Sequence, residues 1–371
     1  MARAWLFLFV LLSGGAATAD DSTPSRLADL LGSEADERFA RALTPRSFTF
    51  PADHGPHPEF RNEWWYVTGN LDDEAGRRFG FELTFFRFSL APTLPASDSR
   101  WRTNQVYIAH LAVTDASGEQ FYVAERYSRG AVGLAGATAQ QFRVWIDDWQ
   151  IAEQASTEAW RLQASDDGFG IDVELTALRQ PVLNGIDGLS KKSADHASYY
   201  YSISRLQTDG KLRIGDREFR VSGMSWLDRE WSTSALATDQ IGWDWFALQL
   251  ADGTDLMFYQ IRKTDGTPDR ASAGTIVGID GVASHLTNDD VEVVVEDTWM
   301  SPEAGTYPAR WTLRVPRFGL DVTVTPVISN QELFTIVRYW EGAVDVAGEH
   351  DGLPITGRGY VELTGYAQPS D

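Results

Sequence analysis

The sequence lacks cysteine entirely across its 371 residues. That absence excludes a disulfide framework and a lipid anchor on cysteine. Histidine is scarce as well, and the six histidines show no H-E-x-x-H or H-x-H spacing, so we expect no metal site. The pattern Gly-x-Ser-x-Gly does not occur, which argues against an α/β-hydrolase, and no glycine-rich segment has the context of a phosphate loop. We therefore expect no cofactor.

Positive charge is the second shortage. The 32 Lys and Arg residues stand against 53 Asp and Glu residues, which gives a net charge of −21. This balance argues against binding to nucleic acid or to an anionic membrane surface, so we expect no nucleic-acid partner. The simplest interpretation is a solvated acidic surface that keeps the protein dispersed.

Long apolar runs are missing after the first residues, since no later segment approaches the roughly 18 apolar residues of a membrane-spanning helix. The early run, Trp5 to Leu12, is too short to span a bilayer. It follows Arg3 and leads to Ala17-Thr18-Ala19, a pattern typical of a secretory signal that is cleaved after Ala19. We expect an exported protein, periplasmic or secreted, and the lack of cysteine favours a bacterial periplasm.

Aromatic residues are abundant instead, with 14 Trp, 12 Tyr and 19 Phe. Such side chains supply large apolar area and favour strands. Alternating patterns cover residues 79–88 and 105–113, and Asp-Gly pairs that suit tight turns recur, among them Asp167-Gly168, Asp209-Gly210 and Asp351-Gly352. This pattern predicts an all-β fold of antiparallel sheets, as sandwiches or up-and-down barrels.

The length and a faint internal repeat indicate two domains. Glu63-Trp64-Trp65 precedes a hairpin that ends at Arg87, and Trp243-Asp244-Trp245 precedes a hairpin that ends at Arg262. Roughly 350 mature residues also exceed one ordinary core. We predict two tandem β-barrels, with the chain divided into a signal peptide at 1–19, a polar segment with a short helix between Ser25 and Leu43 at 20–47, a first domain at 48–222 and a second at 223–371.

The first candidate cluster surrounds Glu63. In a strand, neighbouring side chains point to opposite faces, so Trp64 and Trp65 have different environments and Glu63 shares a face with Trp65. An acid in an apolar interior is costly unless it is paired, and that cost can raise its pKa. The motif therefore indicates either an acid of a functional site or an aromatic plug with Glu63 on a structural arginine.

The second cluster follows Gly223. In an extended segment Trp226, Asp228 and Glu230 face one way, whereas Arg229 and Trp231 face the other. Two carboxyls about 7 Å apart on one face repel each other and tend to separate in pKa, as acid–base chemistry requires. The alternative is a salt bridge from either acid to a strand arginine.

A third cluster contains consecutive tyrosines. Alternation places Tyr199 and Tyr201 on one face, where two phenols can line a pocket and donate hydrogen bonds. The alternative is that they are edge or girdle residues of a barrel.

Six motifs carry a resemblance to a known family: His57 to Leu71 with Glu63-Trp64-Trp65-Tyr66 at its centre, Ser198 to Ser202, Trp226 to Trp231, Gly242 to Phe246, Tyr339 to Gly342, and Gly359 to Tyr366. From about Phe48 to Ala367 the chain resembles the AttH-type lipocalin-like proteins. These are often labelled predicted secreted hydrolases and are related to carotenoid 1,2-hydratase (hydroxyneurosporene synthase).

The resemblance implies two lipocalin-like barrels and a cofactor-independent hydratase, in which a protonated carboxyl adds a proton to an isoprenoid double bond and water captures the cation. The family's catalytic Asp lies in a Tyr-x-Asp strand, to which Trp226-Leu227-Asp228 is similar. The family's upstream His-x-Trp pair corresponds to Tyr199-x-Tyr201. Asp228 has therefore lost the histidine that would reprotonate or orient it.

Our leading hypothesis is a periplasmic, tandem lipocalin-like protein that binds a hydrophobic isoprenoid or lipid-like ligand. Hydratase or hydrolase chemistry is assigned to Asp228, assisted by Glu230 and Glu63. The expected ligand-binding residues are aromatic: Trp64, Trp65, Tyr199, Tyr201, Trp226, Trp231, Trp243 and Trp245. The competing hypotheses are a non-catalytic lipid carrier and an accessory protein of an envelope transporter or export system. The sequence makes no prediction of oligomeric state.

Overall fold

The computed structural model describes residues 37–155, 157, 159–233, 236–302 and 305–366. The described chain is built from antiparallel strands, so the all-β prediction is confirmed. Its helices are three short 3-10 turns, η1 (Ala52–His54), η2 (Asn288–Asp290) and η3 (Pro316–Phe318). Across these described ranges, no helix is long and apolar enough to cross a membrane.

Two expectations concern the N-terminus. The signal peptide at 1–19 lies outside the described residues. Most of the expected helical segment, Ser25 to Leu43, also lies outside them, and its described part, residues 37–43, contains no helix.

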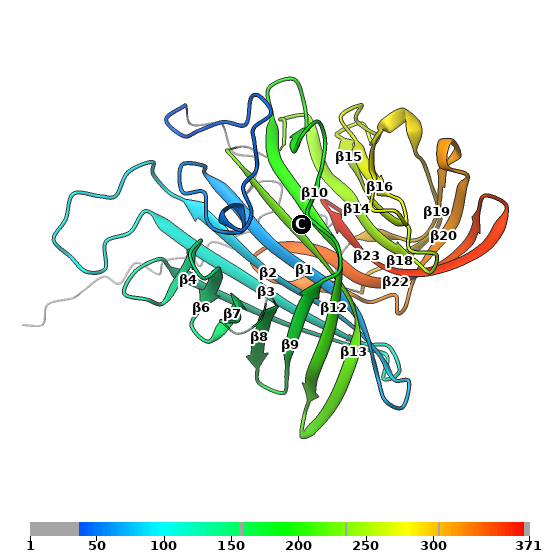
Figure 1. The fold of residues 1–371 in the computed structure, drawn as a ribbon, viewed down its shortest axis with the longest axis horizontal. Coiled ribbons are helices and arrows are strands. Elements are labelled where there is room, and N and C mark those ends of the chain that lie inside the picture. Colours follow the sequence, from blue (N-terminus) through cyan, green and yellow to red (C-terminus); the bar gives the residue numbers. More distant parts are fainter. Residues whose placement is uncertain (1–36, 156, 158, 234–235, 303–304, 367–371) are drawn as a thin grey trace, which may run out of the picture.

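The first sheet contains 13 strands and curls into a near-barrel (Figure 1). Its main path runs β4-β3-β2-β1-β13-β12-β9-β8-β7-β6-β5, and β10 and β11 pair with β12. Contacts of β3 and β4 with β5 and β6 bring the two ends of the path together. The bounds are β1 (Asn62–Asp73), β2 (Arg78–Ser89), β3 (Gln105–Asp115), β4 (Gln120–Arg129), β5 (Ala135–Thr138), β6 (Arg143–Ile146), β7 (Trp149–Glu153), β8 (Trp160–Asp166), β9 (Phe169–Ala177), β10 (Val182–Leu183), β11 (Leu189–Lys191), β12 (Ala197–Ile214) and β13 (Arg217–Ser232).

The second sheet contains 10 strands and forms a half-barrel beside the first. Its main path runs β17-β16-β15-β14-β23-β22-β20-β19-β18, and β21 pairs with β22. The bounds are β14 (Gln240–Leu250), β15 (Asp255–Lys263), β16 (Ala273–Val277), β17 (Ala283–Thr287), β18 (Glu292–Met300), β19 (Thr306–Val315), β20 (Leu320–Pro326), β21 (Glu332–Phe334), β22 (Arg338–His350) and β23 (Leu353–Thr364).

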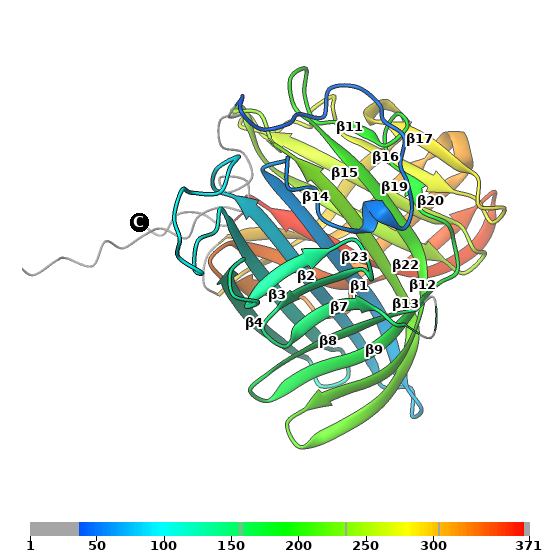
Figure 2. The same cartoon turned by 60° about the vertical axis from the view of Figure 1, so that its left-hand side comes forward.

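The sheets separate in the sequence between residues 232 and 240. The expected domain boundary, between 222 and 223, lies inside β13, all of which pairs within the first sheet. The two sheets pack face to face (Figure 2): β1 contacts β23, β2 contacts β22, and β12 contacts β14.

Turn chemistry explains most of the hairpins. Gly168 joins β8 to β9 with φ 87°, and Asp351 and Gly352 join β22 to β23 with φ 53° and 73°. These positive φ values favour glycine and tolerate aspartate. The turn predicted at Asp209-Gly210 is wrong, because both residues lie within β12. Gly210 is needed there for close approach, since a Cβ on it would lie 2.3 Å from the carbonyl oxygen of Asp172.

Apolar side chains gather in three layers: inside the first sheet, inside the second, and between the two. The predicted repeat appears as two hairpins, β1–β2 and β14–β15, each crossed by an ion pair. Glu63 pairs with Arg87 in the first hairpin, and Asp244 pairs with Arg262 at 2.9 Å in the second. The layer between the sheets holds the candidate site.

Candidate functional site between the two sheets

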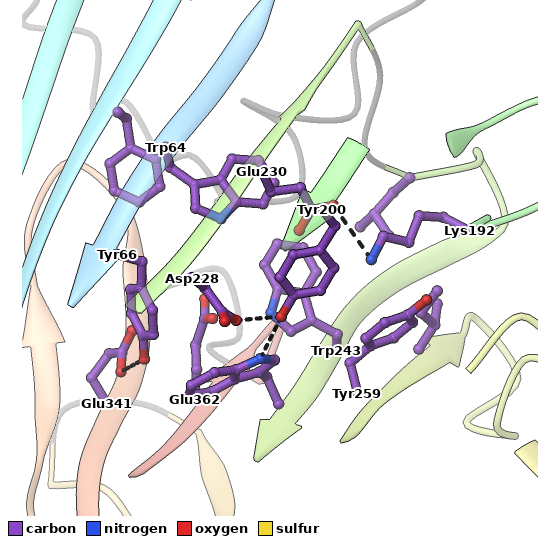
Figure 3. Close-up of a pocket in the computed structure, with 14 residues that line it drawn as sticks. Trp64, Tyr66, Lys192, Tyr200, Asp228, Glu230, Trp243, Tyr259, Glu341 and Glu362 are labelled. Carbon is purple, nitrogen blue, oxygen red and sulfur yellow. Dashed lines mark hydrogen bonds and ion pairs between the residues drawn. The ribbon is translucent and has the colours of Figure 1, made fainter. Parts of the chain in front are cut away.

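A small cavity of about 60 Å³ opens between the sheets (Figure 3). Its walls combine aromatic rings with four carboxyl side chains. The first sheet and the segments next to it contribute Trp64, Tyr66, Phe86, Lys192, Tyr200, Asp228, Glu230 and Leu236, and the second sheet contributes Trp243, Trp245, Tyr259, Ile261, Glu341 and Glu362. In the part of the chain that the structure describes, no three acidic or histidine side chains are grouped as a metal site.

Strand alternation places the acids of β13 in this cavity. Asp228 and Glu230 point between the sheets, whereas Arg229 and Trp231 point into the first barrel, as predicted. Register extends the arrangement across neighbouring strands: Asp228 lies opposite Tyr66 on β1 and Ser202 on β12. One face of three paired strands therefore converges on the same cavity.

Asp228 is held by neutral hydrogen-bond donors. The Trp226 indole donates to it at 2.6 Å, and the hydroxyls of Tyr200 and Ser202 also donate to its carboxylate. Tyr200 is oriented in turn by the Trp245 indole, which donates to its hydroxyl at 3.1 Å. Burial raises the pKa of Asp228 to about 6, although the three hydrogen bonds oppose that rise by favouring the ionised form.

The second sheet supplies two more acids. Glu362 on β23 lies opposite Trp245 on β14 and opposite Glu341 on β22, so these side chains share one face. Burial, together with the nearby charges of Asp228 and Glu230, raises the pKa of Glu362 to about 8, although a hydrogen bond with Trp243 acts in the opposite direction. Burial raises the pKa of Glu341 well above its usual range, and the Tyr66 hydroxyl donates to this carboxyl at 2.8 Å.

Glu230 has a cationic partner within the cavity. Lys192 lies 3.4 Å from its carboxylate, and the ammonium also lies 3.7 Å from the centre of the Tyr259 ring. Burial lowers the pKa of Lys192, but the charges and hydrogen bonds of Glu230 and Tyr259 together more than offset this, and the net shift is upward. Glu230 therefore has a salt bridge, as in the alternative that the sequence offered, but its partner is Lys192, just after β11, and not a strand arginine.

Glu63 lies on the other face of β1, inside the first barrel. Its carboxylate accepts hydrogen bonds from Arg87, from Arg229 at 2.6 Å and from the backbone of His57 at 3.1 Å. Burial tends to raise the pKa of Glu63, but the two guanidinium groups hold it far below its usual range. Glu63 is thus the partner of structural arginines, the second of the two interpretations that its motif allowed.

The structure divides the candidate residues into two groups. The candidates that line the cavity are Asp228, Glu230, Trp64, Trp243 and Trp245. Trp226 does not line it but donates a hydrogen bond to Asp228. The remaining candidates pack inside the first barrel with Glu63 and do not line the cavity: Trp65, Tyr199, Tyr201 and Trp231.

The tyrosines differ from expectation by one position. Tyr200, between the two tyrosines that the sequence indicated, is the one that reaches Asp228. Tyr199 donates to the backbone oxygen of Thr44 instead, and Tyr201 bonds the His54 ring at 2.6 Å. Because side chains alternate along a strand, an error of one residue moves the whole set to the opposite face.

Sequence reasoning also missed Tyr66, Lys192, Glu341 and Glu362. Tyr66 could have been found, because alternation places it on the same face as Trp64. Glu341 and Glu362 stand within the motifs of the family resemblance, but only the pairing of β22 with β23 shows that they are neighbours.

Two curled antiparallel sheets, with a pocket of acids and aromatic rings between them, are consistent with tandem lipocalin-like barrels. The AttH-like family model matches residues 41–366, and the chain belongs to this family. The crystal structure of an AttH protein from Nitrosomonas europaea is similar over 89% of this chain and 100% of that one, with 32% identity and a TM-score of 0.78.

A second similar structure is kievitone hydratase from Nectria haematococca. It shares 16% identity over 86% of this chain and 93% of its own, with a TM-score of 0.66, and this likeness shows the fold alone. Among curated proteins, none matches this chain significantly.

Proposed function

We propose that this protein adds water across a carbon–carbon double bond of an apolar substrate by acid catalysis in the pocket between the sheets. What carries the proposal is that two carboxyls, Asp228 on β13 and Glu362 on β23, line one pocket and that their surroundings separate their pKa values. Glu362, with a pKa of about 8, is mainly protonated at neutral pH, whereas Asp228, with a pKa of about 6, is mainly ionised. Such a pair supplies one acid and one base.

The proposed reaction balances without a cofactor. The Glu362 carboxyl gives its proton to one alkene carbon, so a C–H bond forms as the π bond breaks and a cation develops on the adjacent carbon. Water attacks that cation through its oxygen, and its surplus proton passes to the Asp228 carboxylate. The proton then returns from Asp228 to the Glu362 carboxylate, directly or by way of solvent, and both groups are reset.

The aromatic walls suit a cationic intermediate. The tryptophans that line the pocket with the acids are Trp64, Trp243 and Trp245. Figure 3 labels the first two. The faces of tryptophan rings attract cations, and the attraction strengthens where water is excluded. The walls also exclude most competing water and offer an apolar surface to the substrate.

The pocket volume limits what enters. At about 60 Å³ the cavity is well below the ~300–1,000 Å³ of pockets that bury a drug-sized ligand. We therefore propose that only the reacting end of an isoprenoid or lipid-like chain enters, while the remainder lies outside. The AttH-like family supports the fold that would carry this reaction, and the Nectria haematococca protein of similar fold is named a hydratase.

A non-catalytic carrier is the second candidate, favoured by the full set of donors around Asp228. Three hydrogen bonds satisfy this carboxylate without a substrate, as they would in a purely structural site. Export to the periplasm, and delivery to an envelope transporter, stay predictions for either function.

Hydration is tested with terminal isoprenoid alkenes in water labelled with heavy oxygen, followed by mass spectrometry. The wild type should form an alcohol that carries the label, and Glu362→Gln and Asp228→Asn should each lower the rate on the order of 100-fold, as expected for a positioned proton-transfer group. Glu332→Gln is the control, because this buried glutamate of the second sheet bonds Tyr307 and Arg338 and does not line the pocket. Unlabelled substrate recovered bound and unchanged supports the carrier instead.

A further inference from the structure

A row of buried acids continues from the pocket into the contact between the sheets. Glu341 is opposite Glu362 on paired strands, and Glu82 on β2 receives a hydrogen bond from Thr84 in the same layer. Glu82 and Glu341 are 0% and 1% exposed. One oxygen of each, together with the Tyr360 hydroxyl, has no hydrogen-bond partner among the described residues. Buried oxygens in this state are costly unless they share protons.

A hydrogen-bonded chain leads from Tyr339, beside this row of acids, to the surface. Tyr339 stands two residues before Glu341 on β22, so the two side chains share a face. The Tyr339 hydroxyl lies 2.5 Å from Nδ1 of His110 on β3, and Nε2 of the same ring lies 3.0 Å from the Glu125 carboxylate on β4. The side chain of His110 is 1% exposed and that of Glu125 is 19% exposed, so the chain reaches solvent at Glu125.

We propose that Glu125, His110 and Tyr339 form a proton path that connects solvent to the carboxyls between the sheets, and through Glu341 to Glu362. His110 suits this role because its two nitrogens bond groups on opposite sides, one buried and one at the surface. The ring also lies edge-on to the Phe86 ring, with 5.5 Å between the two centroids. Among the described residues, the hydrogen bonds of the ring thus connect Tyr339 on one side with Glu125 on the other.

Each transfer along the path breaks one O–H or N–H bond and forms another, so atoms and charge balance. A proton taken up by Glu125 passes to Nε2 of His110, and the Nδ1 proton passes to Tyr339. No direct hydrogen bond joins Tyr339 to Glu82 or Glu341 among the described residues, so its hydroxyl proton reaches these carboxyls through a bridging water. Only the purpose of the path rests on the proposed function: the proton that it delivers would reprotonate Glu362 after each turnover. Exchange of protons with solvent needs no substrate.

Infrared spectroscopy of the purified protein tests the path directly. The carbonyl stretch of the protonated buried carboxyls shifts when their hydrogen is replaced by deuterium, so its rate of shift in heavy water measures proton access. Tyr339→Phe and His110→Gln should retain this band but slow its shift on the order of 100-fold, the loss expected when a positioned proton-transfer group is removed. Glu125→Gln, a change near the surface, should slow the shift with the least risk to folding.

Tyr307→Phe is the matched control, because it removes a buried phenol that is not part of the path. The Tyr307 hydroxyl donates to Glu332 at 2.7 Å. Its band should shift at the wild-type rate. The proposal is overturned if the wild type has no protonated-carboxyl band, if the path variants match Tyr307→Phe, or if the band shifts only as fast as the amides of β22 exchange. Slowed exchange without hydration of any alkene would retain the path and reject the proposed function.

Discussion

Two buried carboxylates on paired strands show how neighbouring groups decide the state of an acid. Glu63 and Asp228 lie on β1 and β13, and both are almost fully buried. Glu63 pairs with Arg87 and Arg229 inside the first barrel, whereas the hydrogen-bond donors to Asp228 between the sheets are neutral. The pKa of Glu63 is lowered and that of Asp228 is raised, although burial acts upward on both.

This difference has opposite consequences for stability. A lowered folded-state pKa means that Glu63 stabilises the fold above the usual range of its carboxyl, and this contribution is lost as pH falls. The raised pKa of Asp228 means that the fold is most stable when this acid is protonated, and stability is lost as pH rises through about 6. The first acid strengthens the barrel, and the second destabilises the fold once it is ionised.

Removing a partner of Glu63 should produce the largest effect. Arg229→Met leaves a fully buried carboxylate with one guanidinium partner fewer, and breaking such a pair costs about 3–5 kcal/mol. Denaturant unfolding measures the loss. The control is Arg358→Met, whose bond to Asp72 is partly exposed and worth about 0–1 kcal/mol. Equal effects of the two substitutions would contradict the role given to the Glu63 cluster.

The second prediction concerns pH. The folded and unfolded pKa values of Asp228, about 6 and 3.8, differ by about two units. At about 1.4 kcal/mol per unit, ionisation should cost the folded wild type about 3 kcal/mol, and Asp228→Asn should not pay it. Between pH 4 and pH 7, the free energy of unfolding of the wild type should therefore fall relative to that of the variant. Parallel pH profiles would show that Asp228 titrates normally.

A smaller effect separates the two faces of β12. Tyr200→Phe and Tyr199→Phe each remove one hydroxyl and should each cost about 1 kcal/mol. Only Tyr200→Phe should raise the pKa of Asp228 further, because it removes a donor to the ionised form. Carboxyl NMR titration checks this contrast. A change in the titration of Asp228 caused by Tyr199→Phe would mean that the two faces are not independent.

Local pattern was enough to predict some of these features. Alternation correctly placed Asp228 apart from Arg229, and the repeat of acid, tryptophans and arginine correctly indicated the hairpins that contain Arg87 and Arg262. These predictions depend on neighbours along one strand or across one hairpin, where spacing alone decides the contact.

Long-range pairing and register could not be predicted in this way. Glu362 reaches the pocket because β23 pairs with β14 and the second sheet packs on the first, contacts that span more than one hundred residues of sequence. The choice of Tyr200 over its neighbours depends on the register of β12 against β13. Gly210 looked like a turn residue because a glycine serves close strand packing and tight turns equally well.

The protonation state of Glu362 tests the account most directly. Carboxyl NMR of protein labelled at glutamate, with Glu362→Gln used to assign the signal, gives its pKa in the intact chain. We predict a midpoint of about 8, so that the group is an acid at neutral pH beside an ionised Asp228. A midpoint near the ordinary value of 4.5 would contradict the account, because the pocket would then hold no proton for an alkene at neutral pH.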